Sequence, residues 1–182
     1  MFTIGHSTRP IDELVDLLKV HGVKRVVDVR TIPRSRHNPQ FDIEALPQSL
    51  ESAGIAYEHM PSLGGLRHAR KDSPNDGWRN ASFRGFADYM LTEDFANALE
   101  RLMEMSRREP TAIICAEALP WRCHRSLISD ALTARGEVVE HIIGRGGAQR
   151  HRLTPWARVE DGHVTYPAPR QGGEGIEDGD GS

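Results

Sequence analysis

The sequence predicts an α/β fold, a three-layer Rossmann-like sandwich built on a mostly parallel sheet. The first observation is that short apolar runs alternate with segments of helical periodicity through most of the chain. That alternation is typical of parallel strands joined by helices that cover both faces of the sheet. The second observation is that polar residues repeatedly follow the apolar runs. In such sheets, ligands bind beyond the carboxyl ends of the strands.

The first half of the chain contains three expected strands and two expected helices. Residues 2–5 form a short apolar strand, and residues 23–29 are rich in valine, whose β-branched side chain favours strands. Residues 55–59 alternate apolar and polar positions, as a short strand does. Helices are expected over 10–22, between an initial proline and a final glycine, and over 42–53, interrupted or restarted near Pro47. A long polar loop covers 61–77.

The second half repeats the alternation. Helical patterns cover 83–90 and 92–108, and an apolar strand follows Pro110 and ends before Glu117. Pro120 is expected to open a helix that Gly136 ends, because proline is favoured in the first turn and glycine after the last. A last core strand covers 138–143, a Gly- and Arg-rich loop covers 144–152, and a hairpin turns at Asp161-Gly162.

Length and composition set limits on the class of protein. The chain has 182 residues, of which 38% are hydrophobic and 27% charged, as in an ordinary globular protein. We expect one α/β domain over 1–166 and a disordered tail over 167–182, which is rich in Gly, Asp, Glu and Pro. The net charge of -3 does not indicate a strongly basic nucleic-acid binder, although it allows a local basic patch.

Cysteine usage and hydropathy suggest the compartment. Two cysteines do not make a disulfide framework. The first residues lack a charged segment followed by a long apolar one, so we do not expect a signal peptide. No apolar run reaches the roughly 18 residues that span a membrane. We therefore expect a cytoplasmic protein with reduced thiols and no membrane partner.

Reactive side chains gather at the expected carboxyl edge of the sheet. They follow each strand in turn, and both cysteines of the chain lie in the segment 111–126. Because the carboxyl ends of parallel strands share one edge, a single site should collect these side chains. They are His6, Ser7, Asp28, Arg30, His59, Glu117, Cys123, His124 and Arg125.

Five ordered motifs resemble the family known as domain of unknown function 488. They are Gly5-His6-Ser7, Asp28-Val29-Arg30 with Pro33 and Ser35-Arg36, Tyr57, Leu63-Gly64-Gly65, and Cys115-x-Glu117-x-x-Pro120-x-x-Cys123-His124-Arg125. The resemblance extends from residue 3 to about residue 143. It implies a compact α/β domain, and it brings no established activity.

An arginine cluster indicates an anionic ligand. Guanidinium groups match phosphate and carboxylate oxygens, and the helix expected after Pro120 adds N–H groups and positive potential. The ligand would be a nucleotide, a nucleic-acid phosphate or another anionic small molecule. The alternative is a structural network of ion pairs with Asp28 and Glu117. The arginines concerned are Arg30, Arg34, Arg36, Arg122 and Arg125.

Acid–base chemistry has several candidates. Asp28 and Glu117 are a possible carboxylate pair, with Glu117 the better catalyst and Asp28 the better partner for an arginine. His6 and His124 are possible general bases. A zinc site built from the histidines and cysteines is disfavoured, because seven residues separate the two cysteines and no Cys-x-x-Cys is present. We therefore expect no metal and name no cofactor.

Three further features have two interpretations each. Gly64 and Gly65 allow either a close approach of backbone to a ligand or simple loop geometry. Tyr57 and Trp121 either stack on a base or belong to the core or its rim. The segment 144–152 either contacts phosphate or is a solvated loop.

The sequence leaves three functions open. The first is an enzyme acting on a phosphate-bearing substrate, with Glu117 or His6 as acid or base. The second is a sulfur-transfer or redox enzyme with Cys123 as nucleophile, and the third is a non-catalytic anion-binding module. Cys123 is expected in the first turn of a helix, where a thiolate is favoured, and Cys115 is expected inside the sheet. Alternatively, Cys123 packs inward as a small apolar residue.

Overall fold

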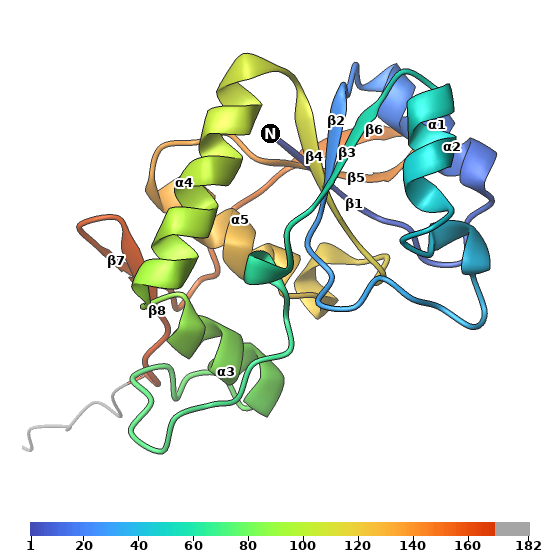
Figure 1. The fold of residues 1–182 in the computed structure, drawn as a ribbon. Helices are drawn as coiled ribbons and strands as arrows, with labels where there is room; N and C mark the ends of the chain where they lie inside the picture. Colours follow the sequence, from blue (N-terminus) through green and yellow to red (C-terminus); the bar gives the residue numbers. More distant parts are fainter. Residues whose placement is uncertain (170–182) are drawn as a thin grey trace, which may run out of the picture.

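The computed structural model describes residues 1–169 and has a six-stranded sheet at its centre, in the order β3-β2-β4-β1-β5-β6. Every neighbouring pair is parallel except β5 with β6, which is antiparallel. The predicted three-layer α/β sandwich is confirmed (Figure 1). The strands are β1 (Phe2–Gly5), β2 (Arg25–Asp28), β3 (Ala56–His59), β4 (Thr111–Cys115), β5 (Glu140–Gly144) and β6 (Gly147–Arg150).

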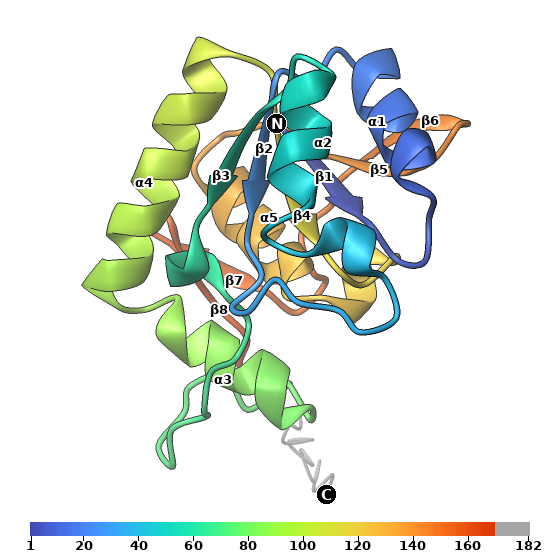
Figure 2. The same ribbon diagram turned by 45° about the vertical axis from the view of Figure 1, so that its right-hand side comes forward.

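Helices cover the two faces of the sheet and give two separate apolar clusters. On one face, α1 (Ile11–Val20) and α2 (Leu46–Ser52) pack on Ile4, Val26 and Ile114 (Figure 2). On the other face, helices pack on Val27, Val29 and Ile113. These are α3 (Ala81–Tyr89), α4 (Glu93–Arg108) and α5 (Arg125–Ala134). The all-buried pattern of β4 follows, since its alternate side chains enter opposite clusters.

A small hairpin lies outside the main sheet. It pairs β7 (Arg158–Glu160) with β8 (His163–Thr165), as the sequence predicts. Its two turn residues, Asp161 and Gly162, have φ values of 50° and 77°. Positive φ at both central positions is the geometry that asparagine or aspartate followed by glycine favours in a two-residue hairpin turn. Val164 then reaches the same apolar cluster as α5.

The expected helix from Pro120 is wrong in its start. Pro120–Arg122 form only a 3-10 turn, η3, and α5 begins at Arg125. Between them, Cys123 has extended backbone, with φ -133° and ψ 147°. Proline therefore does open a helical turn here, but the chain leaves it before the α-helix starts. Cys123 consequently precedes the helix instead of lying in its first turn.

Three other segments differ from the sequence prediction. The helix expected over 42–53 is shorter, beginning at Leu46 with Pro47 in its first turn, and it follows a separate 3-10 turn, η1 (Pro39–Phe41). The loop expected over 144–152 contains β6. The long loop begins with a third 3-10 turn, η2 (Pro61–Leu63). The side chains of β6 are mostly exposed, so its sequence shows no alternation of apolar and polar residues that would predict a strand.

Two expectations concern the ends of the chain and the membrane. No helix within residues 1–169 is long and apolar enough to cross a bilayer. The tail predicted to be disordered, 167–182, lies outside the described residues except for its first three. Within those three, the Ala168 N–H donates to Asp76 Oδ1 at 2.6 Å.

Candidate thiol–imidazole site

A cleft of about 660 Å³ lies at the carboxyl edge of the sheet, where β1, β2 and β4 end. The sequence predicts a site at this edge, and most of the predicted residues line the cleft. Of the predicted site residues, those in its lining are His6, Ser7, Arg30, Arg34, Gly65, Glu117, Arg122, Cys123 and His124, and Cys115 joins them.

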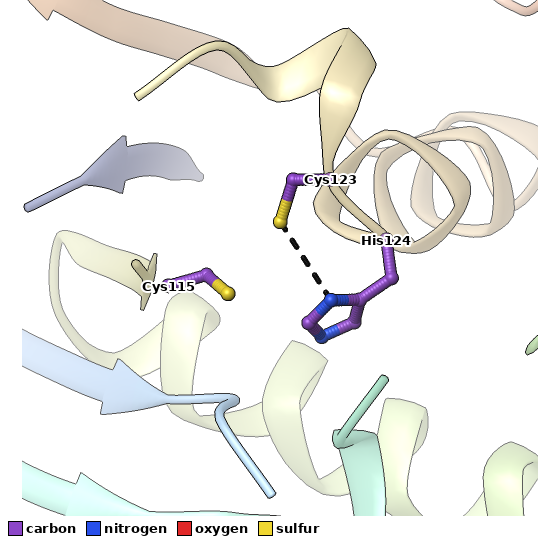
Figure 3. A group of neighbouring side chains, drawn as sticks. All are labelled: Cys115, Cys123 and His124. Carbon is purple, nitrogen blue, oxygen red and sulfur yellow. Dashed lines mark hydrogen bonds between the residues drawn. The ribbon is translucent and has the colours of Figure 1, made fainter. Parts of the chain in front are cut away.

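The Cys123 thiol and the His124 imidazole face each other in this cleft. Cys123 Sγ lies 3.6 Å from His124 Nδ1 (Figure 3). On the other side of the ring, His124 Nε2 lies 3.1 Å from the carbonyl oxygen of Val29. A carbonyl only accepts, so Nε2 carries the hydrogen, and Nδ1 of the neutral ring is left as an acceptor for the thiol proton. Phe86 fixes the ring from the side, with centroids 5.0 Å apart. The pair therefore has the geometry of a nucleophile and its base.

Cys115 is the second sulfur at the site. It ends β4, is buried as the sequence predicts, and points toward Cys123 and His124 (Figure 3). Both cysteines are free. A hydrogen bond from the Cys115 thiol, together with His124, lowers the pKa of Cys123 well below its usual value. The same hydrogen bond and burial raise the pKa of Cys115. Cys123 is thus the sulfur that ionises first.

The same three side chains can hold a metal ion. Their donor atoms, two sulfurs and one imidazole nitrogen, lie within 4.8 Å of one another. The His124 Nε2 hydrogen bond to a backbone carbonyl is the outer-shell contact that metal-bound histidines usually make. Sequence spacing argued against zinc, but the end of β4 and the turn before α5 bring distant cysteines together. Within residues 1–169, no other group of three such donors was found.

Arg30 is committed to a buried carboxylate. Its Nε donates to Asp28 Oδ1 at 2.8 Å and its Nη2 to Asp28 Oδ2 at 2.5 Å. Tyr57 donates its hydroxyl to the same carboxylate at 2.9 Å, and burial followed by the Asp28 charge raises the pKa of Tyr57. Asp28 has no exposed surface. For these residues the structure matches the ion-pair alternative, and Asp28 and Tyr57 do not line the cleft.

His6 is also fully engaged. Its Nδ1 donates to the Ser7 carbonyl oxygen at 2.8 Å, so its Nε2 accepts from Arg30 Nη1 at 3.1 Å. The ring stacks on Phe41 with centroids 4.2 Å apart. Burial lowers the pKa of His6 to about 4, which keeps it neutral near pH 7. Both ring nitrogens of His6 therefore have hydrogen-bond partners, which disfavours the expected role of His6 as a general base.

Of the remaining predicted anion binders, only two face the cleft. Arg125 is 1% exposed, donates to Thr3 Oγ1 at 3.2 Å and also to the carbonyl oxygens of Glu117 and Ala118, so it supports the 116–118 loop from inside. Arg36 is exposed but absent from the lining. Arg34 and Arg122 are exposed and line the cleft. The predicted five-arginine cluster is therefore wrong in its extent.

Three glycines shape the site by the space they leave. A Cβ on Gly65 would lie 2.6 Å from His124 Nδ1, and one on Gly64 would lie 2.9 Å from Thr31 Cα. A Cβ on Gly5 would collide with the carbonyl oxygen of Glu117. The close approach expected at Gly64 and Gly65 is therefore real, but in this structure the approached atoms belong to the protein. Glu117 itself is exposed at the cleft.

Sequence reasoning missed a second buried group of polar side chains. His141 bonds Thr3 Oγ1 at 2.7 Å through Nδ1 and His151 at 2.9 Å through Nε2, and His151 reaches Asp130 at 2.8 Å. Burial, reinforced by His151, lowers the pKa of His141 to about 4. The available signal is a histidine beside the apolar residues of a strand, His141 before Ile142, together with an aspartate, Asp130, on the buried side of a helix.

The arrangement of these motifs agrees with a family comparison. A model for "Domain of unknown function DUF488" matches residues 10–132, which includes both cysteines and the Asp28-Val29-Arg30 motif. The chain belongs to the DUF488 family. The match leaves out Gly5-His6-Ser7, of which His6 and Ser7 line the cleft of this DUF488 protein. Searches of curated proteins and of solved structures gave no significant match.

Proposed function

We propose that this DUF488 protein is a thiol-dependent enzyme in which Cys123 is the nucleophile and His124 accepts its proton. The observation that carries the proposal is the 3.6 Å contact between Cys123 Sγ and His124 Nδ1 at the wall of a cleft. Cysteine nucleophiles are activated by an adjacent base whose other nitrogen is held by a third group. Here that third group is the Val29 carbonyl.

The cleft suggests the substrate class. Its volume of about 660 Å³ suits a small molecule or the end of a chain. Arg34 and Arg122 are the cationic side chains of the lining that no buried carboxylate engages, so an anionic substrate is favoured. This retains the expected anionic ligand, and it prefers the alternative with Cys123 as the reacting group to acid–base chemistry by Glu117 or His6.

The step is transfer of an electrophilic group to sulfur. The Cys123 proton moves to His124 Nδ1, a bond forms between Sγ and the electrophilic atom, and the leaving group departs with the electron pair of the broken bond. The imidazolium returns the proton to the leaving group. Release to water or to a second acceptor regenerates the thiol.

The test compares the alkylation rates of the two cysteines within one protein. Peptide mass spectrometry after timed iodoacetamide treatment of the wild type should show Cys123 labelled faster than Cys115, with a midpoint below the ~8.5 of a free thiol. His124→Gln should slow labelling at Cys123, and Arg36→Ala, outside the cleft, should not. Prior treatment with a chelator, with metal analysis of the sample, separates a thiol blocked by metal from an inert one. Slow, equal labelling with an ordinary midpoint in metal-free protein rejects the proposal.

A further inference from the structure

A second cleft, of about 920 Å³, lies beside η3. The 3-10 turn divides the two clefts, since Arg122 lines the first and its neighbour Trp121 lines the second. All three tryptophans of the chain, Trp78, Trp121 and Trp156, line this second cleft. We call it the tryptophan cleft. The thiol mechanism uses none of its residues.

Two of the tryptophans present open surface. Trp121 is 59% exposed and Trp156 is 39% exposed, whereas no phenylalanine or tyrosine among residues 1–169 is exposed to this extent. Trp156 is held edge-on against Trp78 with centroids 5.0 Å apart, and Trp78 packs on Tyr166 at 5.4 Å. Single exposed apolar side chains are normal, but exposed apolar side chains that gather in one cleft often mark a binding site.

The charge around these rings has one sign. Among residues 1–169, the charged side chains of the lining are Arg150 and Arg152, and the lining has no carboxylate. The lining residue His141 is neutral near pH 7, because burial lowers its pKa to about 4. Both arginines are exposed, and neither forms an ion pair within residues 1–169, although Glu140 lies opposite Arg150 in the strand ladder. The chain as a whole carries a net charge of -3, so this concentration of unpaired positive charge is local. A ligand that complements this charge is an anion.

The cleft wall is held in place from within. The buried Asp130 accepts from the Thr154 N–H at 3.0 Å, from the Thr154 hydroxyl at 2.7 Å and from His151 at 2.8 Å. It also accepts from Tyr166, the residue behind Trp78, at 2.8 Å. The backbone on either side of Arg152 is therefore anchored to α5. A binding surface held this way loses little conformational entropy when a ligand binds.

We propose that the tryptophan cleft binds single-stranded nucleic acid. Trp121 and Trp156 supply faces on which bases stack, and Arg150 and Arg152 contact the phosphates. Stacking platforms joined to a cationic groove are how proteins hold single strands without reading sequence. A simple polyanion would use the arginines but leave the exposed rings unexplained. An apolar peptide would use the rings but leave the arginines without counter-charges.

Native fluorescence reports directly on this cleft, because every tryptophan of the protein lines it. Titration with a ten-nucleotide oligothymidylate at low salt should quench that fluorescence to saturation. The logarithm of the binding constant should fall against the logarithm of salt concentration with a slope of about −1.4, for two phosphates on a single strand.

Variants separate the two kinds of contact. Trp121→Ala should raise the dissociation constant roughly 5- to 100-fold, as expected for a lost stacking contact. Trp121→Phe should restore most of the affinity, and Leu66→Ala, an exposed apolar side chain of the other cleft, should have no effect. Arg150→Ala and Arg152→Ala should each flatten the salt slope by about 0.7. Arg108→Ala, exposed at the end of α4, is the matched control.

Three outcomes overturn the proposal. One is the absence of quenching at low salt. Another is equal affinity for inorganic polyphosphate, which removes the role of the bases. The third is equal affinity for thymidine 5′-monophosphate, which removes the role of the strand. Because Trp121 is 59% exposed, its replacement leaves the core intact, and circular dichroism of the variant checks this.

Discussion

Two buried aspartates, Asp28 and Asp130, lie beneath the two clefts, and they are neutralised in different ways. Neither has any exposed surface, and each accepts a tyrosine hydroxyl, at 2.9 Å from Tyr57 and 2.8 Å from Tyr166. Asp28 also faces a guanidinium group that binds both its oxygens. Within residues 1–169, Asp130 has no guanidinium partner and instead accepts from His151, Thr154 and Tyr166.

Asp28 and Arg30 form a compact ion pair, whereas Asp130 belongs to an extended series of hydrogen bonds. Arg30 satisfies Asp28 within two residues of sequence and places His6 beside the thiol cleft. Asp130 instead begins a series of hydrogen bonds that passes through His151 and His141 to Thr3. Arg30, Arg125 and Asp130 therefore stabilise the fold through buried hydrogen bonds. At the thiol cleft, the two thiols and His124 lie together, and Glu117 is exposed.

The largest effect should come from removing the guanidinium group beneath the thiol cleft. Arg30→Ala leaves Asp28 as an unpaired buried charge, which should lower the free energy of unfolding by about 3–5 kcal/mol. Urea unfolding followed by circular dichroism measures this. Arg34→Ala, whose side chain is 72% exposed, should cost almost nothing. A similarly small loss of unfolding free energy in both variants would show that Asp28 does not depend on Arg30 for its neutralisation.

The next effect is a pH dependence that both regions share. His6 and His141 have a pKa of about 4 in the folded protein, against about 6.5 in the unfolded chain. The unfolded chain therefore binds protons between those values that the folded one does not, so stability is complete above pH 6.5 and falls as the pH is lowered. Between pH 6.5 and 5, each histidine should cost at most about 2 kcal/mol. Ordinary carboxylates titrate below this pH range, so they do not obscure the effect. A free energy of unfolding that does not change between pH 6.5 and 5 would contradict the lowered pKa values of His6 and His141.

The smallest effect compares the two tyrosines directly. Tyr166→Phe should cost about 2 kcal/mol, because a buried carboxylate without a guanidinium loses one of its few donors. Tyr57→Phe should cost about 1 kcal/mol, since Arg30 still binds both oxygens of Asp28. The pair removes the same atom from the same kind of acceptor, so each variant controls for the other. A larger loss at Tyr57 would reverse the comparison.

The fold was largely predictable from sequence because its signals are local. The apolar run before Glu117, the proline and glycine at the ends of the 10–22 helix, and Asp161-Gly162 each determine a short stretch of backbone. The location of the site was predictable, since the carboxyl ends of parallel strands lie at one edge of the sheet and bring the residues that follow them together. Which residues face the cleft was not, because Arg30 and Arg125 have partners set by packing between elements. The missed strand β6 carries few apolar side chains, so hydropathy gives no sign of it.

The glycines at positions 5 and 65 imply an unusual sensitivity to single-base changes in the gene. Every missense change of a glycine codon adds at least one carbon, and here the first added carbon meets the carbonyl of Glu117 or the imidazole of His124. Neither position has a conservative replacement, since alanine is already too large. In a saturation library, both should tolerate fewer substitutions than the exposed Trp121, although neither glycine contributes a functional group of its own.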